Sequence, residues 1–544
     1  ISCSLVGSEM CIRDRYKPNK NQEYILEELN KAWNLGKKYI IINAPTGSGK
    51  SIISKTIAQS APDISATYRD FVDSGAIYDI EEDDVPDSLK EGTAILTVTK
   101  SLQDQYKKLF PEDTMLKGKS NYPCSMVPTL SSDLGPCVFE PEQKELCISC
   151  GQCEYFLKRD EALKHKCSFY SYSMFMSLPP ACRAKRNIIA DECAELEDLL
   201  VQSYTVPFNF KILKKLNIEI PPTPTQGSNY EKYILWLRSA KASIYSTLVE
   251  KRKEMRGKDL KKMSKEKKLV FRAINIFNDS CDKVLDIIDN NEFIIEHNKE
   301  ELIFKPFKVD KIAQRLFKHC DLVVLMSATI IDYKNFAKQL GIKEDEYYYI
   351  ESASTFDPKK APIHLSNFLS VSYSNKALVI PQLCKIAKQI CENYKGKKGI
   401  IHTHTFEITE AFKKAVGNNP RFLFREPGKT NEFLINEHIE RNDDTILVSP
   451  SMTHGVDLCG ALGEFAVILK APFLPLGDER VKRLAQDDKE WYTNKMLGAC
   501  IQMCGRTIRN ASDEAVTYIL DGTLTKSLIQ NKDKLPKYFL ERFV

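Results

Sequence analysis

The segment that most constrains the fold is Ala44-Pro-Thr-Gly-Ser-Gly-Lys-Ser51, which follows the apolar run Tyr39-Ile-Ile-Ile42. This order predicts a strand, a phosphate-binding loop and a helix. The glycines let backbone N–H groups converge on phosphate oxygens, and the helix N-terminus adds a partial positive charge. Lys50 is expected to contact the β- and γ-phosphates, and the Ser51 hydroxyl to hold Mg²⁺. The match is a variant, because Ala44 stands where the general pattern has glycine.

A second apolar segment ends in two carboxylates, in the order Asn187-Ile-Ile-Ala190-Asp191-Glu192. A phosphate-loop ATPase needs such a pair at the end of a strand, one to hold Mg²⁺ and one to polarise the attacking water. Asp191 and Glu192 are the candidates for these two roles. The pair is a weak signal alone, but together with the phosphate loop it predicts ATP hydrolysis.

The second half of the chain repeats the alternation of strands and helices without a phosphate loop of its own. Its expected strands are 399–402, 421–424, 445–449, 465–469 and 516–520. Gly455-Val-Asp457 follows one strand, and Gln502-Met-Cys-Gly-Arg506-Thr-Ile-Arg509 precedes the last. Arg506 and Arg509 are expected on one face of a helix, where guanidinium groups suit the charge of a transferring γ-phosphoryl group.

Hydroxyl and imidazole side chains follow two further apolar runs. Leu322-Val-Val-Leu-Met326 is followed by Ser327-Ala-Thr329. Small hydroxyl residues at the end of a parallel strand lie where α/β sheets bind their ligands, so they could couple phosphate state to a neighbouring domain. His402 and His404 are expected to project to the same side of one strand. No partner ligands for a metal are visible beside them.

Composition gives few constraints on partners. The 544 residues include 78 basic and 73 acidic side chains, so the net charge of +5 does not identify one. No segment approaches the roughly 18 consecutive apolar residues of a membrane span, and the N-terminus lacks a secretion signal. We therefore expect a soluble protein of the cytoplasm, or of a nucleoid or viral replication site. Residues 1–15 resemble a translated adapter scar and are excluded from the fold prediction.

Two segments interrupt the alternation in the first half. Residues 61–92 are polar and acidic and are expected to form a solvated surface loop. Residues 205–303 carry long helical patterns, within which 251–268 holds ten basic side chains against three acidic ones. That basic run is typical either of a solvated helix face or of a surface that contacts a phosphate backbone.

Six of the 17 cysteines lie between Cys124 and Cys167. In a reducing compartment such clustering favours a metal over disulfides. Spacing alone fits either an iron–sulfur cluster or a four-cysteine zinc site. Cys167 is expected to be a buried thiol on a strand. The five remaining candidates, one more than a single site needs, are Cys124, Cys137, Cys147, Cys150 and Cys153.

In their order along the chain, these motifs resemble those of superfamily 2 helicases. The segments Leu116-Lys-Gly-Lys-Ser-Asn-Tyr-Pro-Cys124 and Cys153-Glu-Tyr155 narrow the resemblance to the XPD/DinG branch. It covers nearly all of residues 16–544. The resemblance implies an α/β fold with two RecA-like parallel-sheet motor domains, the first carrying an iron–sulfur insertion and a helical arch. The implied boundaries are 16–117, 168–204 and 304–350 for the first motor domain, 118–167 for the cluster insertion, 205–303 for the arch, and 351–544 for the second motor domain.

The resemblance also implies ATP-driven translocation on single-stranded DNA, usually 5′ to 3′, by a monomeric motor that unwinds forked DNA. Its implied cofactors are ATP, Mg²⁺ and a [4Fe-4S] cluster, with zinc as the alternative. Cys124 and Cys153 are the implied outer ligands, and Cys137 and Cys147 are favoured over Cys150 to complete the set. The implied nucleotide-site residues are Gln22, Gly47, Ser48, Gly49, Lys50, Ser51, Asp191, Glu192, Gly455, Asp457, Gln502, Arg506 and Arg509.

The sequence departs from the family pattern at two positions. Ala194 ends the Asp-Glu box where His is usual, and His454 stands where an acid often precedes Gly455. Two alternatives therefore stay open. One is a DNA-stimulated ATPase or translocase that remodels protein–DNA complexes without unwinding. The other is a nucleic-acid-binding module with a degenerate ATP site. In the favoured hypothesis the cluster insertion acts as a rigid wedge near the duplex junction.

Overall fold

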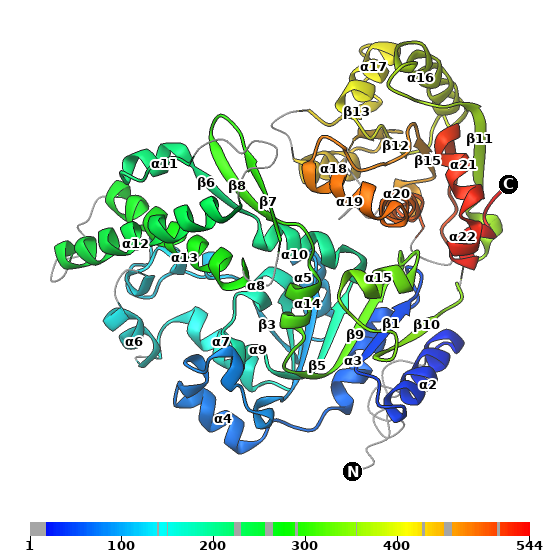
Figure 1. Cartoon of the computed structure of the whole chain (residues 1–544). Coiled ribbons are helices and arrows are strands. Elements are labelled where there is room, and N and C mark those ends of the chain that lie inside the picture. The colour runs from blue at the N-terminus through cyan, green and yellow to red at the C-terminus, as the bar shows by residue number, and fades with distance from the viewer. Residues whose placement is uncertain are drawn as a thin grey trace.

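The computed structural model contains two sheet-centred lobes and a helical projection (Figure 1). The residues that it describes are 18–138, 141–149, 151–221, 230–255, 265–288, 292–354, 356–426, 430–450, 458, 460–508 and 512–544. We name the part built on the seven-stranded sheet lobe 1, and the part built on the six-stranded sheet lobe 2. Both are α/β units with parallel sheets, as the sequence predicts.

Every strand pair in the sheet of lobe 1 is parallel. The strands, in spatial order, are β10 (Tyr347–Glu351), β1 (Tyr39–Asn43), β9 (Cys320–Ser327), β5 (Lys185–Asp191), β2 (Thr93–Thr97), β4 (Cys167–Ser171) and β3 (Thr114–Leu116). β1 and β2 are buried at every position, because helices cover both faces of the sheet. The parallel arrangement brings the carboxyl ends of β1, β5 and β9 to the same edge.

Helices cover both faces of this sheet. α2 (Lys20–Asn34), α3 (Lys50–Ser60) and α5 (Lys100–Leu109) pack on one face, where Tyr106 lies in the same apolar cluster as Ile189 of β5. The other helices of lobe 1 are α4 (Ala66–Asp73), α6 (Pro141–Ser149), α7 (Glu154–Lys164), α8 (Tyr172–Met176), α9 (Pro180–Arg183), α10 (Leu196–Tyr204), α14 (Asp310–Leu316) and α15 (Tyr333–Gln339).

Lobe 2 repeats this architecture, again with only parallel pairs in its sheet. Its strands, in spatial order, are β11 (Ile363–Leu369), β16 (Val516–Asp521), β15 (Phe465–Ile468), β12 (Gly399–His402), β14 (Ile446–Ser449) and β13 (Phe422–Phe424). Its helices are α16 (Lys376–Asn393), α17 (Phe406–Val416), α18 (Asn431–Glu440), α19 (Glu479–Asp487), α20 (Lys489–Cys504), α21 (Gly522–Gln530) and α22 (Lys537–Leu540).

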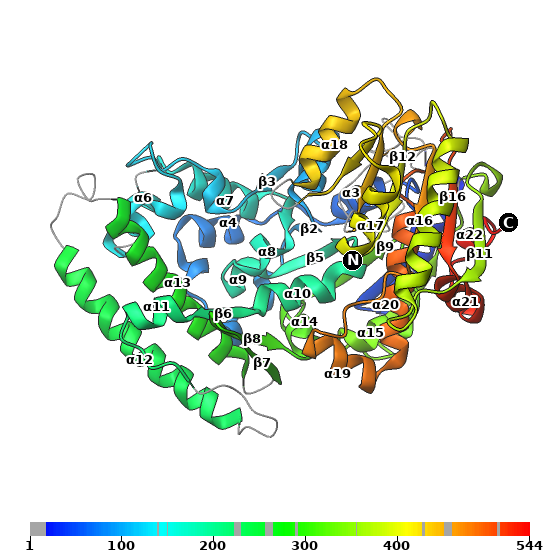
Figure 2. The ribbon, with the colours of Figure 1, turned by 90° about the horizontal axis from the view of Figure 1, so that it is seen from above.

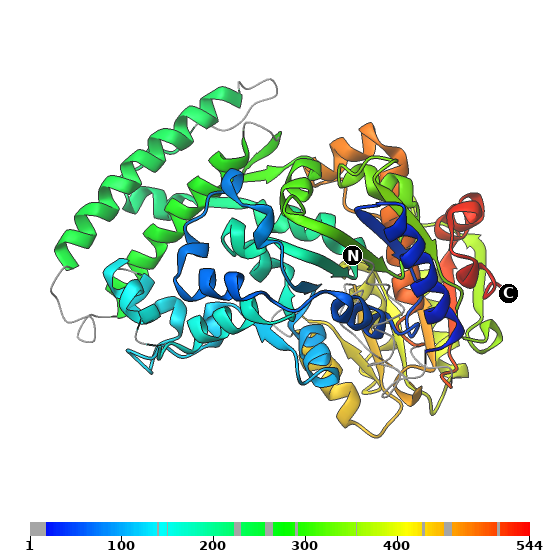
Figure 3. The same cartoon turned by 90° about the horizontal axis from the view of Figure 1, so that it is seen from below.

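A third sheet, antiparallel and three-stranded, carries the helical projection. Its order is β6 (Val206–Asn209), β8 (Glu301–Pro306) and β7 (Phe293–His297). α11 (Phe210–Lys215) follows β6, and the long helices α12 (Tyr230–Met255) and α13 (Lys265–Ile288) pack side by side. Views from above and below show this projection extending away from lobe 2 (Figures 2 and 3). Much of the basic run 251–268 lies outside the described residues.

The base of the projection also contacts lobe 2, through α19. Arg480 is 5% exposed, and its Nε donates hydrogen bonds to the carbonyl oxygens of Pro306 and Phe307, both at 3.0 Å. Two ion pairs, each at 2.7 Å, add to this contact: Lys305 with Asp478, and Arg483 with Glu292. The three-stranded sheet therefore bridges the helical projection and lobe 2.

The expectation of a solvated loop for residues 61–92 is wrong. The segment contains helix α4 and three short 3₁₀ turns. Five of its buried apolar side chains join the main core of lobe 1: Ile64, Tyr68, Val72, Ile77 and Leu89. The first three are spaced four residues apart, as on one face of a helix, but the many acidic residues of the segment outweighed this short pattern, which explains the error.

In the part of the chain that the structure describes, no helix combines the length and the apolar character required to cross a bilayer.

Candidate functional site

The phosphate loop connects β1 to α3 through two glycines in the left-handed region. Gly47 has a φ of 78° and Gly49 a φ of 82°, and such angles are costly for residues with a side chain. A Cβ on Gly49 would lie 2.0 Å from Nε2 of Gln22, so Gln22 covers the turn closely. The Ser48 hydroxyl is buried without a hydrogen-bond partner among the described residues. The glycines therefore let the loop turn tightly beneath Gln22.

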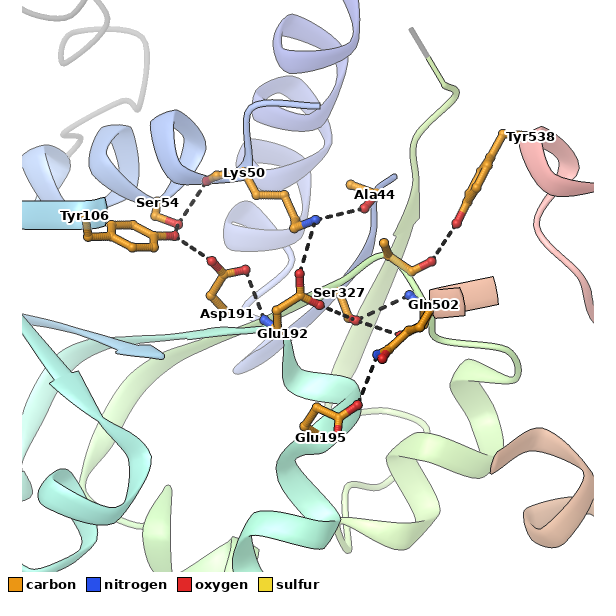
Figure 4. A network of polar contacts seen from close by, with 12 residues as sticks. Ala44, Lys50, Ser54, Tyr106, Asp191, Glu192, Glu195, Ser327, Gln502 and Tyr538 are labelled. Atoms are coloured by element: carbon orange, nitrogen blue, oxygen red, sulfur yellow. Dashed lines mark hydrogen bonds and ion pairs between the residues drawn. The ribbon is translucent and has the colours of Figure 1, made fainter. Parts of the chain in front are cut away.

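Lys50 is the first residue of α3, and its side chain extends back across the loop. Its Nζ lies 3.3 Å from the carbonyl oxygen of Ala44 and 3.9 Å from Oε1 of Glu192 (Figure 4). Its side chain is 10% exposed. The ammonium group is thus held over the loop, beside the carboxylate that ends β5.

Asp191 ends β5 and is fully enclosed. Its Oδ2 accepts a 2.9 Å hydrogen bond from the Tyr106 hydroxyl, and its Oδ1 accepts one from the backbone N–H of Glu192 at 3.0 Å. Burial, and next the nearby Glu192 carboxylate, raise the pKa of Asp191 to about 6. Because a divalent cation favours the ionised form of such a carboxyl group, this environment suits a metal ligand.

Glu192 has a φ of 52°, a conformation uncommon for a residue with a side chain. Its Oε2 accepts a hydrogen bond from the Ser327 hydroxyl at 3.3 Å. Ser327 ends β9, and its hydroxyl lies 3.2 Å from that of Thr329. The strand ends of β5 and β9 are therefore linked by side chains at the edge of the sheet where the phosphate loop lies.

Lobe 2 reaches this edge through α20 and α22. Nε2 of Gln502 donates hydrogen bonds to Oε1 of Glu195 at 3.0 Å and to Oγ1 of Thr329 at 3.3 Å. The Tyr538 hydroxyl donates to the carbonyl oxygen of Ala328 at 2.6 Å. Figure 4 shows these contacts converging from both lobes on the Ser-Ala-Thr segment. Polar contacts thus run without a break from Lys50 to Gln502.

A cavity of about 240 Å³ lies between the lobes beside this network. Its lining includes Thr46 of the phosphate loop, Glu192, Gln502 and Arg506. Arg506 lies in a turn, since α20 ends at Cys504, so the expectation of a helix carrying both arginines is wrong at Arg506. The cavity thus combines phosphate-loop residues with a lobe 2 arginine.

Several predicted site residues lie outside the described residues: Arg509, Gly455, Asp457 and Cys150. The structure brings the rest of the nucleotide set together at the interlobe edge. His404 differs from its expectation, because β12 ends at His402 and His404 follows it with a φ of 63°. The two histidines therefore do not form an alternating pair on one strand.

Three residues of this network have no recognisable motif in the sequence. Tyr106 lies on α5 and Tyr538 on α22, and no local pattern connects either tyrosine with the phosphate loop. Glu195 directly follows the Asp-Glu box, three positions after Glu192, so its proximity in sequence was the one available signal. Its hydrogen-bond partner is 307 positions away and could be found only from the fold.

The cysteine-rich insertion buries four of the five predicted ligands. Burial raises the pKa of the Cys137 thiol, the Lys119 ammonium lowers it, and the neighbouring thiols of Cys153 and Cys124 raise it further. A Cβ on Gly135 would lie 2.8 Å from the Cys124 sulfur, so glycine leaves room beside this thiol. The buried thiols are those of Cys124, Cys137, Cys147 and Cys153, which are 2–8% exposed.

These thiols match the donor chemistry of an iron–sulfur or zinc site, since each metal is bound by buried cysteine sulfurs. The described side chains of this chain, however, contain no three His, Cys, Asp or Glu residues in a metal-binding arrangement. Cys167 lies on β4 and is buried, as predicted.

Comparisons with known proteins agree with this architecture. Residues 388–541 match the family model of the helicase C-terminal domain. No curated protein matches the chain by sequence. Among solved structures, an XPD helicase has a TM-score of 0.57 at 15% identity, covering 94% of this chain and 98% of its own. Xpd4 of S. tokodaii has a TM-score of 0.56 at 14% identity, covering 93% and 97%. The chain thus has the XPD fold with its two RecA-like domains, which confirms the resemblance at the level of the fold.

Proposed function

We propose that this chain, which has the fold of the XPD helicases, is an ATP-driven motor that moves 5′ to 3′ on single-stranded DNA and unwinds forked duplexes. The observation that carries the proposal is the contact path from the phosphate loop to lobe 2. Glu192 lies between Lys50 of the loop and Ser327, and Thr329 lies between Ser327 and Gln502. A ligand bound at the loop would therefore alter the contact between the lobes.

In this mechanism the phosphate loop and Lys50 bind the β- and γ-phosphates. Ser51 and Asp191 would hold Mg²⁺, which neutralises charge on the phosphate oxygens when bound. Glu192 orients and polarises the attacking water from its position 3.9 Å from the Lys50 ammonium. Arg506 and Arg509 are proposed to stabilise the charge that develops on the γ-phosphoryl group.

Movement follows from the location of these groups on two lobes. Glu192 belongs to lobe 1, whereas Gln502 and Arg506 belong to lobe 2. Binding of ATP between the lobes would draw them together, and loss of the γ-phosphate would release them. A strand bound across both lobes would be moved by each such cycle.

We also propose that four of the five cysteines hold a [4Fe-4S] cluster, with Cys124, Cys137, Cys147 and Cys153 as the favoured set. The support is that these four thiols are buried in one insertion, with Gly135 leaving space beside Cys124. A cluster would cross-link an insertion that otherwise has few regular elements. Iron and acid-labile sulfide in the anaerobically purified protein would support it, whereas stoichiometric zinc without iron would replace it with a Cys₄ zinc site.

The experiment that tests the motor is ATP hydrolysis by the full chain with and without single-stranded DNA. We expect DNA-stimulated turnover, and we expect Lys50→Ala to lower it about 100-fold or more, because the charge that binds the transferring phosphoryl group is lost. Lys343→Ala is the matched control, since this lysine is 77% exposed and outside the site. No hydrolysis by the wild-type chain would overturn the proposal.

Strand separation and direction need a second assay. Partial duplexes with a single 5′ tail or a single 3′ tail are incubated with ATP, and strand release is measured for each. Release from the 5′-tailed duplex alone supports the proposal. Displacement of a bound protein without strand release would instead support a translocase that remodels protein–DNA complexes, and equal release from both tails would contradict the stated direction.

A further inference from the structure

The Asp-Glu box ends in a residue that cannot form a polar contact through its side chain. After Glu192, the chain makes a 3₁₀ turn over Cys193–Glu195, and Ala194 lies within it. Ala194 and Gln502 both line a second interlobe cavity, of about 340 Å³. Ala194 carries only a methyl group, so any side-chain hydrogen bond from this turn to Gln502 must come from another residue.

Glu195 makes that contact. Its Oε1 accepts the 3.0 Å hydrogen bond from Nε2 of Gln502, and the two residues belong to different lobes. The same nitrogen donates to Thr329, which ends the path from Glu192 through Ser327. Glu195 and Thr329 are therefore the two acceptors that orient the Gln502 amide.

A carboxylate on α10, the helix that follows this turn, holds α20 at its other end. Glu197 accepts a hydrogen bond from Nε1 of Trp491 at 2.9 Å and pairs with Lys495 at 3.0 Å. Glu197 is 5% exposed, so it anchors the helix as a whole. Because α20 is already anchored there, the contact of Glu195 bears on the orientation of the Gln502 side chain rather than on the position of the helix.

We propose that Glu195 is a positioning residue that couples ATP hydrolysis in lobe 1 to lobe 2 by orienting Gln502, in place of the side chain that Ala194 lacks. This rests on the proposed function, because it assumes that Gln502 acts on an ATP hydrolysis site. The role is one of orientation: Glu195 contacts the amide of Gln502 and leaves phosphate binding to Lys50 and the loop.

The first test compares Glu195→Ala with Glu195→Gln in the full chain. The amide oxygen of glutamine can still accept from Gln502, so the conservative variant should keep kcat within about twofold of wild type. Glu195→Ala should lower kcat about tenfold in the presence of single-stranded DNA, equivalent to about 1.4 kcal/mol of transition-state stabilisation. The KM for ATP and the affinity for a fluorescent ATP analogue should stay within about twofold, because the loop is untouched.

Two results would overturn this proposal: an unchanged kcat in Glu195→Ala, or an equal loss in Glu195→Gln. Either is distinct from failure of the proposed function, in which the wild-type chain itself would not hydrolyse ATP. A structural role alone would lower kcat and nucleotide affinity together and would contradict the expected separation of kcat from KM.

A charge exchange gives an independent check should Glu195→Ala fold poorly. Gln502→Glu alone sets two carboxylates against each other and should reduce kcat more than Glu195→Ala. Combining it with Glu195→Gln restores one amide and one carboxylate with the donor and acceptor exchanged. Recovery of at least a tenth of wild-type kcat in the double variant supports the direct contact, and a double variant no better than Gln502→Glu refutes it.

Discussion

Replacing Glu197 with glutamine should weaken the attachment of α20 to lobe 1 by about 3 kcal/mol. The carboxylate is 6% exposed and pairs with Arg480 at 2.7 Å and with Lys495 at 3.0 Å. Burial alone would raise its pKa, but the charges of Lys495 and Arg480 and the hydrogen bond from Trp491 outweigh burial and lower the pKa from 4.5 to about 2. At 1.36 kcal/mol per unit, that shift corresponds to about 3 kcal/mol.

The usual cost of breaking a buried ion pair leads to a similar loss of free energy. Removing one partner of a buried ion pair costs about 3–5 kcal/mol, because the remaining charge is left without compensation. Here two cations would be left: Arg480, with a side chain 5% exposed, and Lys495, at 17%. Lys495 keeps Asp198 at 2.9 Å, so the expected loss lies near the lower end of that range.

The assay is hydrogen exchange of the backbone amides in α20, measured at pH 7. A loss of about 3 kcal/mol in local opening free energy should accelerate their exchange about 100-fold, while amides of α16, in the same lobe, keep their wild-type rates. Glu479→Gln is the matched control, because Glu479 lies on α19 and is 52% exposed. Exchange within about twofold of wild type in Glu197→Gln would refute the reasoning.

The stability that Glu197 contributes depends on pH in a predictable direction. Because folding lowers the pKa of Glu197, its stabilisation is complete above about pH 4.5 and is lost as the pH falls towards 2. The charged groups that face it are Arg480, Lys495 and Asp198. The difference between wild type and Glu197→Gln in urea unfolding, followed by tryptophan fluorescence, should therefore shrink only below about pH 4.5. A constant difference down to pH 2 would contradict this assignment.

Three further outcomes are expected. Gly49→Ala should weaken binding of a fluorescent nucleotide about tenfold or more, because the new Cβ meets Gln22 at 2.0 Å and the φ of 82° costs about 1–2 kcal/mol; unchanged affinity would contradict this. Tyr106→Phe should raise the half-saturating Mg²⁺ concentration in ATP hydrolysis about tenfold, since Asp191 loses the group that orients it, and an unaltered Mg²⁺ titration would count against Asp191 as the ligand. Cys124→Ser should remove the cluster and abolish unwinding while ATP hydrolysis persists; normal unwinding by cluster-free protein would disprove the wedge hypothesis.

The sequence was sufficient where local chemistry determines structure. The strand Tyr39–Asn43 can be predicted from its own residues, because an apolar run before a glycine-rich loop has few alternatives. The same holds for the strand that ends in Asp191. Tyr68 and Val72 were misjudged because their helical spacing covers only two turns and stands beside many acidic residues. The helix end at Cys504 was missed although Gly505 marks it, since a glycine directly after the last helical residue is a helix-stop signal.

The contacts that join the two lobes could not be obtained in this way. The contact between Glu195 and Gln502 joins residues 307 positions apart, and that between Ala328 and Tyr538 joins residues 210 positions apart. Both hydrogen bonds depend on how the two sheets face each other. Residue type alone suggests that a buried Glu197 needs cations, but which cations follows only from the packing of α10 against α20.

Because α19 contacts the three-stranded sheet, a movement of lobe 2 would be transmitted to the base of the helical projection. α13 ends at Ile288, close in sequence to β7, and its 24 residues span about 36 Å at 1.5 Å per residue. A tilt of about 5° at the base, such as a small shift of lobe 2 would impose through Arg480, would displace the far end by about 3 Å, close to one nucleotide step along a strand. That far end adjoins the basic run 251–268. A rotation of a few degrees where Arg480 meets the sheet would thus move the far end of α13 by several ångström.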